Sequence, residues 1–577
     1  MSATSQSADW SNGLLPQQAR AASYSDGHAR LLAGPGTGKT LTLTGHTVYL
    51  INEKKIAPNR ILALTFTRAA AQELRGRVEA VVGKEHLPKI STLHSFALQQ
   101  LIAAGSSNLS LPRPVRIADD WEEQNIIRRD LSSTLGATPD QIEDLYHRMS
   151  SDWESLSAES DQWEQVFPDA SFLGAWRQHR DVYGYTLRSE LVYQLKRTLD
   201  NNPLGNIGQD FDHVLVDEYQ DLNRCDLAII RHFANRGATI LAAGDDDQSI
   251  YGFRMAHPEG IRRFLDEYDD AERLDLEICM RCDQTILALG RFVAEQDPDR
   301  THKDLVPRQD SSSGVVSFLQ FHSQRAEAAG IAKVCRTLLD SGQAVASDLM
   351  ILLRSDSHGG FSKVIVEALQ DHGVPVTVGT ASTDILDERS GRIVLAWLRL
   401  LADSKDHLSW RTIIQETTSN RLGAGAIQAI FELATDRGRR FSEAVKLVAD
   451  EPSCLPRYGN RVKSEYDRIQ ALLADIKERH PVDQSLTRDE ASMLIANVVA
   501  ATVEPSSTAY EIRQHLTDSL PEGAELKLVD IVASAKGPID SAEQATSPDT
   551  ANILTMHKAK GLTADVVFVV GAEDQYI

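Results

Sequence analysis

Cysteine is scarce in this sequence, with five residues in a chain of 577. So few cysteines in so long a chain exclude a disulfide-scaffolded secreted protein and agree with a reducing compartment. No apolar run approaches the roughly 20 residues needed to cross a bilayer, and the N-terminus, MSATSQSADW, lacks a basic-then-apolar signal segment. We therefore expect a cytoplasmic protein with no membrane partner.

Positive charge is also in short supply, with 60 Lys and Arg against 82 Asp and Glu and a net charge of −22. Nucleic-acid binding depends on Lys and Arg contacts with phosphates, so this balance argues weakly against a nucleic-acid partner. A basic groove can still lie on an acidic protein. The content of 42% apolar and 25% charged residues is that of a globular chain, and the length predicts several domains.

The segment AGPGTGKT has the spacing of a phosphate-binding loop, although its first residue is Ala where the strict pattern has Gly. Its glycines can turn tightly and direct backbone N–H groups at a phosphate, at the start of a helix. Lys39 is expected to contact the β- and γ-phosphates, and the Thr40 hydroxyl to bind Mg²⁺. The predicted nucleotide-binding residues here are Ala33, Gly34, Pro35, Gly36, Thr37, Gly38, Lys39 and Thr40.

A second motif, VLVDEYQD, begins at Val214, and its apolar run is typical of a buried parallel strand that ends in two carboxylates. Asp217 is placed to hold Mg²⁺ through water, and Glu218 to orient and deprotonate the attacking water. Two solvated acids at a strand end are a common alternative for an isolated pair. Together, the loop and this motif predict an NTP hydrolase.

Six further segments accompany these two motifs. They are LLPQQARAA (14–22), ILALTFTRAAAQELRGRV (61–78), STLHSF (91–96), GDDDQSIYGFRMA (244–256), LEICMRC (276–282) and ILTMHKAKGLTADVVFVVG (553–571). In their order and approximate spacing they resemble superfamily 1 DNA helicases of the UvrD/Rep/PcrA type. The resemblance runs from about Leu14 to the last residue and implies ATP and Mg²⁺ as cofactors.

The resemblance also implies roles for single residues near the nucleotide. Lys39 and Glu218 would be joined in catalysis by Gln248 as a γ-phosphate sensor and by Arg281 as an arginine finger from the second motor domain. Such an arginine is worth roughly 10³ to 10⁵ in rate. Gln18 would read the adenine edge, and Gly561 would join the nucleotide-binding set.

Contacts with DNA are implied in the same way. Phe66, Tyr251 and Phe253 match positions that stack single-stranded bases, each worth about 1–3 kcal/mol. For any one of them, a core aromatic is the alternative. The residues expected to hold the phosphate backbone are Thr65, Thr67, His94, Arg254 and His557.

The implied fold is α/β, with two RecA-like P-loop NTPase motor domains, each carrying a mainly helical insertion. Within the second motor domain, VVSFLQF, DLMILLR and VPVTVG are expected to be strands. The expected divisions are a polar tail (1–12), the first motor domain (13–100 and 206–272), its insertion (101–205), the second motor domain (273–420 and 550–577) and its insertion (421–549).

The function implied is an ATP-dependent DNA helicase or translocase, moving 3′ to 5′ on single-stranded DNA in repair, recombination or anti-phage defence. Its expected partners are single-stranded DNA, 3′-tailed duplex DNA and a nuclease or other protein subunit. The alternative is a nucleotide-gated DNA-binding subunit with little unwinding of its own, and a relative acting on RNA is a third hypothesis. Relatives continue past the position of Ile577 with a sixth motif that carries a second arginine, so we expect weaker coupling here.

Cys279 and Cys282 form a CxxC pair around Arg281. A closed zinc site needs four ligands, and there is no second pair nearby. We expect a structural role for the pair, with oxidation beside Arg281 as the alternative.

Overall fold

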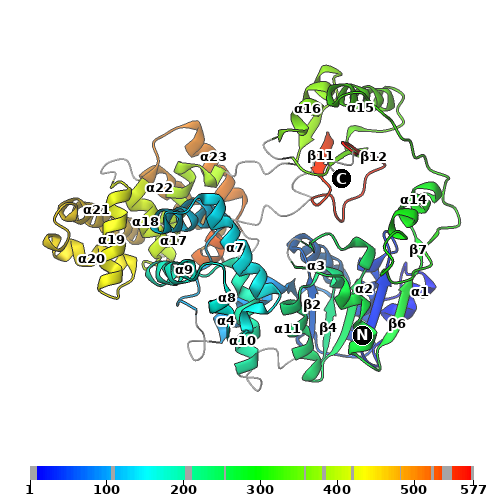
Figure 1. Ribbon diagram of the computed structural model, residues 1–577, viewed down its shortest axis with the longest axis horizontal. Coiled ribbons are helices and arrows are strands. Elements are labelled where there is room, and N and C mark those ends of the chain that lie inside the picture. Colours follow the sequence, from blue (N-terminus) through cyan, green and yellow to red (C-terminus); the bar gives the residue numbers. More distant parts are fainter. Residues whose placement is uncertain are drawn as a thin grey trace, which may run out of the picture.

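The computed structural model describes the chain apart from residues 1–9, 105–110, 202–210, 253–254, 357–358, 380–384, 417–421, 481, 521–524, 536–546, 548 and 573–577. Figure 1 shows three regions: a sheet with helices at the lower right, a smaller one at the upper right, and a helical region at the left. None of the helices in the described part of the chain is long and apolar enough to cross a membrane.

The first region is built on a six-stranded parallel sheet in the order β3-β2-β4-β5-β1-β6. Its strands are β1 (Ala29–Ala33), β2 (Ile61–Thr65), β3 (Lys89–Thr92), β4 (His213–Val216), β5 (Thr239–Gly244) and β6 (Glu272–Leu276). Strands β1 and β2 are buried along their whole length because helices cover both faces of the sheet. The helices of this region are α1 (Pro16–Ala22), α2 (Lys39–Asn52), α3 (Arg68–Val82), α4 (Leu93–Ala103), α11 (Arg224–Asn235), α12 (Glu259–Arg262) and α13 (Phe264–Glu267).

The second region has a four-stranded parallel sheet in the order β10-β11-β9-β12. Its elements are α15 (Gln324–Asp340), β9 (Leu349–Leu353), α16 (Ser362–Asp371), β10 (Val376–Val378), β11 (Ala551–Thr555) and β12 (Val566–Val569). The predicted strands DLMILLR and VPVTVG correspond to β9 and β10. The strand predicted for VVSFLQF is wrong, because no described strand pairs with it and its Val315 and Phe318 are 83% and 87% exposed.

A short connector joins the two sheets along the right side of Figure 1. It contains β7 (Ile278–Cys279), which pairs with β8 (Val306–Pro307), and the helix α14 (Gln284–Ala294). Cys279, Leu287 and Leu305 form its own small core. This connector brings residues that follow β6 over the carboxyl edge of the first sheet.

The helical region draws on two distant stretches of chain that share one hydrophobic core. The first stretch gives α5 (Asp120–Glu122), α6 (Arg128–Leu135), α7 (Pro139–Glu154), α8 (Trp163–Val166), α9 (Ala170–Tyr183) and α10 (Leu191–Asn201). The second gives α17 (Arg389–Ala402), α18 (His407–Glu416), α19 (Ala424–Asp436), α20 (Phe441–Asp450), α21 (Gly459–Arg479), α22 (Arg488–Thr502), α23 (Ser507–Asp518) and α24 (Leu528–Ala535). Buried ion pairs join the stretches: Arg392 and Arg399 of α17 both lie 2.8 Å from Asp119.

The fold is therefore α/β, with two RecA-like motor domains that each carry a mainly helical insertion. We propose two changes to the predicted divisions. The first motor domain extends to Leu276, because β6 pairs with β1 and completes its sheet. The second insertion begins at Arg389, because α17 and α18 pack in the helical core. The remaining boundaries stay predictions.

Candidate active site

The phosphate-binding loop lies between β1 and α2, at the carboxyl edge of the first sheet. Gly36 and Gly38 have φ values of 69° and 85°, in the left-handed region where a side chain would be strained. Gly38 is also the N-cap of α2, so the first backbone N–H groups of that 14-residue helix face the loop. The Thr37 hydroxyl donates to the Gly34 carbonyl oxygen at 2.8 Å and holds the turn closed. This geometry suits an anion at the helix N-terminus.

Gln18 of α1 is buried and contacts the loop directly. Its Nε2 donates to the Thr37 carbonyl oxygen at 2.9 Å, and its Oε1 accepts from the backbone N–H of Leu15 at 2.8 Å. A Cβ on Gly38 would lie 2.4 Å from Gln18 Nε2, so this glycine is needed for the close approach. Gln18 therefore supports the loop, and its predicted contact with adenine stays a prediction.

Lys39, the first residue of α2, forms ion pairs with both acids of the second motif. Its Nζ lies 2.9 Å from Asp217 Oδ1 and also contacts Glu218 Oε1. Burial alone would lower the pKa of Lys39, but the two carboxylates raise it well above its ordinary value. Burial raises the pKa of Asp217, whereas Lys39 and Lys560 outweigh burial at Glu218 and lower its pKa to about 2. Lys39 and Glu218 are therefore charged near neutral pH.

Lys560 reaches this site from the second sheet, in the segment that follows β11. Its Nζ contacts Asp221, donates to the Gln248 carbonyl oxygen at 3.0 Å and lies 3.6 Å from Glu218 Oε2. Burial raises the pKa of the Asp221 carboxyl to about 6 in spite of this lysine. Lys560 was not among the predicted site residues, although its place beside Gly561 in the KAKG segment could have indicated it.

The predicted sensor, Gln248, belongs to an acidic turn after β5, and its Nε2 donates to Asp245 Oδ2 at 2.7 Å. Asp245, Asp246 and Asp247 lie close enough together to suggest a metal site. A lysine already fills the space between them: Lys303 Nζ contacts all three, at 2.6 Å from Asp246 and 2.8 Å from Asp247. The turn is therefore held by a buried cation from the connector, which no motif in the sequence indicated.

Arg281 lies beside the phosphate-binding loop, on the connector. The backbone N–H of Met280 donates to the Gly36 carbonyl oxygen at 2.9 Å. A Cβ on Gly36 would lie 2.4 Å from Arg281 Cβ, so the two backbones are in close contact. The Arg281 side chain is exposed and forms no ion pair with any residue that the structure describes. Its position is compatible with the predicted finger.

Phe66 follows β2 and His94 follows β3, so these two residues lie at the carboxyl edge of the first sheet. The rings of Phe66 and Tyr251 lie 4.6 Å apart, and Tyr251 lies 6.5 Å from the His557 ring, at the second sheet. Lys560 Nζ lies 5.1 Å from the centre of the Tyr251 ring. Two of the predicted DNA contacts, Phe253 and Arg254, lie outside the described residues.

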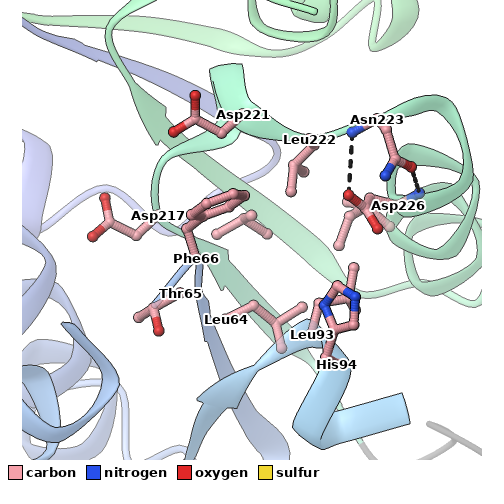
Figure 2. A pocket seen from close by; sticks show the side chains of 12 residues that line it. Leu64, Thr65, Phe66, Leu93, His94, Asp217, Asp221, Leu222, Asn223 and Asp226 are labelled. Carbon is pink, nitrogen blue, oxygen red and sulfur yellow. Dashed lines mark hydrogen bonds between the residues drawn. The ribbon is translucent and has the colours of Figure 1, made fainter. Parts of the chain in front are cut away.

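An open pocket connects these residues to the acids of the second motif (Figure 2). Its lining includes Thr65, Phe66 and His94 from the DNA set, together with Asp217 and Asp221. Thr67 lies just beyond it, where its hydroxyl accepts from the backbone N–H of Ala70 and caps α3. Three candidate DNA ligands thus share one cavity with two acids of the second motif.

The donor set at the loop fits a Mg²⁺–nucleotide. Hard oxygen ligands, which Mg²⁺ prefers, are available from Thr40 and Asp217, and the loop offers backbone N–H groups to phosphates. The Lys39 ammonium lies 2.9 Å from the Asp217 carboxylate, so it competes with a cation for that negative charge. The nucleotide phosphates would give this lysine an alternative partner.

Comparison with known proteins covers nearly the whole chain. Residues 14–269 match the family model of the UvrD/REP helicase N-terminal domain, and residues 274–577 match that of the UvrD-like helicase C-terminal domain. The ATP-dependent DNA helicase PcrA of Bacillus subtilis (strain 168) is 26% identical over 598 residues, covering 98% of this chain and 78% of that protein. DNA helicase II of Haemophilus influenzae is 26% identical over 599 residues, with 98% and 79% covered. The chain therefore belongs to the UvrD/REP helicase family.

Proposed function

We propose that this protein is an ATP-dependent DNA helicase or translocase that moves 3′ to 5′ on single-stranded DNA. The observation that carries the proposal is the position of Lys560. One side chain of the second sheet contacts Asp221 in the catalytic motif and lies over Tyr251 in the candidate DNA set. Lys560 therefore contacts the catalytic motif and the candidate DNA set at the same time. The names of the relatives, ATP-dependent DNA helicase PcrA and DNA helicase II, support the same activity.

The catalytic roles follow from the ion pairs of the first sheet. Lys39 would contact the nucleotide phosphates, and Asp217 with Thr40 would hold Mg²⁺, which would supply positive charge to neutralise the transferred phosphoryl group. Once Lys39 has left, the pKa of Glu218 rises from about 2 toward its ordinary value. Glu218 is then a stronger base for the proton of the attacking water. Gln248 and Arg281 complete the set around the γ-phosphate.

The DNA strand in this proposal runs along the edge between the two sheets. Phe66 and Tyr251, together with Phe253, offer ring faces to bases. Thr65, Thr67, His94, Arg254 and His557 hold the backbone. The partners are single-stranded DNA and 3′-tailed duplex DNA, with a nuclease or other subunit as a protein partner in repair or recombination.

The test is strand separation on matched duplexes that carry a 3′ tail or a 5′ tail. We expect ATP-dependent unwinding of the 3′-tailed substrate and little unwinding of the 5′-tailed one. Lys39→Ala is the negative control, because it removes the proposed phosphate contact and leaves the candidate DNA-binding residues unchanged. Unwinding of the 5′-tailed substrate alone would overturn the proposed direction.

The alternative is a nucleotide-gated DNA-binding subunit. The Lys39 ion pairs favour it, because they hold the catalytic acids in a resting arrangement that needs a trigger. Binding of both ATP and single-stranded DNA without turnover would support this alternative and exclude the helicase.

A further inference from the structure

Two cysteines of the connector form a compact turn directly after β6. The backbone N–H of Cys282 donates to Cys279 Sγ at 3.3 Å. Cys279 is fully buried, whereas Cys282 is partly exposed. The pair therefore has one sulfur that reagents can reach and one that is protected behind it.

This turn packs on the phosphate-binding loop. A Cβ on Gly36 would lie 3.2 Å from Cys279 Sγ, and the intervening Met280 donates its N–H to the Gly36 carbonyl oxygen at 2.9 Å. On the other side, the Cys279 carbonyl oxygen accepts from the backbone N–H of Arg308 at 3.2 Å. The turn is thus fixed on both sides, and Arg281 sits between its two sulfurs in the sequence. A change in its geometry would be transmitted to both the loop and that arginine.

The chemistry of this pair differs from that of the remaining cysteines. Burial raises the pKa of Cys225 and of Cys335 above the ordinary value, so those thiols are inert. At Cys279, hydrogen bonds from the Cys282 thiol and from two backbone N–H groups outweigh burial and lower the pKa to about 6. One proton is shared by the two sulfurs, and the pair titrates as a unit. A thiolate is therefore present at neutral pH and lies mainly on Cys279, because hydrogen bonding to Cys279 and burial raise the pKa of the Cys282 thiol well above its ordinary value.

A metal site does not account for the pair. A zinc ion held by two cysteines needs two more ligands. Among the residues that the structure describes, no third His, Cys, Asp or Glu lies close enough to complete a group with Cys279 and Cys282. What remains is reaction of the two sulfurs with each other.

We propose that Cys279 and Cys282 are a redox modification site that forms a reversible disulfide and thereby slows nucleotide hydrolysis. The effect on hydrolysis rests on the proposed function.

The oxidant is a hydroperoxide. The Cys279 thiolate takes the proton of the exposed Cys282 thiol as the Cys282 sulfur attacks the distal oxygen of the hydroperoxide. This gives a sulfenic acid on Cys282, and the proton passes from Cys279 to the leaving oxyanion, which becomes an alcohol or water. The Cys279 thiolate then attacks the sulfenic sulfur and expels hydroxide. In balance, two thiols and one peroxide give one disulfide, one alcohol and one water, and a dithiol reductant reverses the change.

The effect on hydrolysis follows from the length of the new bond. A disulfide bond is about 2.05 Å long, shorter than the closest approach of two unbonded sulfur atoms, so the turn must contract. Contraction moves the backbone that contacts Gly36 and carries Arg281. A displacement of about 1 Å in groups that position a reaction can cost up to about 100-fold in rate. We expect at least a tenfold loss of turnover.

The experiment treats the purified full chain first with dithiothreitol and then with hydrogen peroxide. The disulfide is detected by peptide mass spectrometry after alkylation, and ATP hydrolysis is measured with and without single-stranded DNA. We expect a 279–282 disulfide, a loss of turnover of about tenfold or more, and recovery on renewed reduction. Absence of the disulfide after the partly exposed Cys454 has been oxidised would overturn the site. A disulfide that leaves turnover unchanged would overturn its effect.

Two variants make the result specific. Cys282→Ser should stay active in peroxide, whereas Cys454→Ser should be inactivated like the parent chain; the reverse pattern would contradict the proposal. Cys282 is partly exposed, so its substitution disturbs the core less than one at Cys279. If the reduced parent chain hydrolyses no ATP, the proposed function fails, while the mass measurement still decides whether the two sulfurs pair.

Discussion

The Nζ atom of Lys39 lies 2.9 Å from Oδ1 of Asp217. The same carboxylate is proposed to hold Mg²⁺ through water, so the Lys39 ammonium competes with the cation for the negative charge of Asp217. We expect nucleotide phosphates to attract Lys39 and to weaken this ion pair.

Removing this lysine should make the acids a better cation site. We predict that Lys39→Met binds Mn²⁺ in the absence of nucleotide at least about tenfold more tightly than the parent chain, because a positive charge next to two carboxylates is lost. The measurement is Mn²⁺ titration by electron paramagnetic resonance. Lys84→Met, on the surface, is the matched control and should leave the affinity unchanged. Equal affinity in Lys39→Met and the parent chain would show that Lys39 does not compete with the cation.

The contact between the sheets should depend on pH through Asp221, whose pKa burial raises to about 6. A carboxyl with a raised pKa in the folded state stabilises the fold below about pH 4, and that stability is lost as the pH rises through about 6. Asp221→Asn cannot ionise, so its stability relative to the parent chain should increase by about 1–3 kcal/mol between pH 5 and pH 7.5. Urea unfolding at the two pH values measures this. Asp310→Asn, at an exposed site, should show no such increase, and a constant difference for Asp221→Asn would refute the prediction.

The buried Lys303 should be a positioning residue for Gln248. Its side chain is 4% exposed and contacts Asp245, which in turn accepts from the Gln248 amide. Lys303→Met removes the buried positive charge that neutralises three carboxylates, so we expect a loss of about 3–5 kcal/mol in unfolding free energy.

At a temperature where the variant is folded, kcat for ATP should fall while KM changes little, and Lys303→Arg should restore part of kcat. Lys333→Met, on the outer face of α15, is the control. A rise in KM with unchanged kcat would mean that Lys303 acts on binding and not through Gln248.

The aromatic pair should carry much of the affinity for single-stranded DNA. Phe66→Ala removes a ring that lies 4.6 Å from Tyr251, and we predict a loss of about 1–3 kcal/mol in binding free energy. Fluorescence anisotropy with a labelled oligonucleotide measures the loss, at one fixed salt concentration. Phe292→Ala on α14, a side chain that is 63% exposed, should bind like the parent chain. Equal losses for the two variants would argue against a specific stacking site.

Much of the first sheet and its loop could be predicted from the sequence, since their signals are local. Glycines at fixed spacing require left-handed backbone at Gly36 and Gly38, and the apolar run of the second motif predicted β4. The prediction of a strand at VVSFLQF was wrong. A strand needs a neighbouring strand to pair with, and an apolar run by itself does not show whether such a partner exists.

The ion pairs at the site could not be predicted, because they join residues far apart in the chain. Lys39 meets Asp217 across the sheet, and Lys560 reaches Asp221 from the other motor domain. Lys303 belongs to no motif, and only the path of the connector places it among three aspartates. The sequence indicated which groups could do chemistry, whereas their resting partners depend on the fold.

The most direct measurement is steady-state ATP hydrolysis by the parent chain with and without single-stranded DNA, beside Glu218→Gln as a variant that lacks the proposed base. We predict that DNA stimulates hydrolysis by the parent chain strongly, at least about tenfold, and that Glu218→Gln binds ATP and DNA but loses about 10²–10⁴-fold in kcat. An ATP hydrolysis rate that is the same with and without DNA would contradict the account. So would a Glu218→Gln variant that hydrolyses ATP as fast as the parent chain.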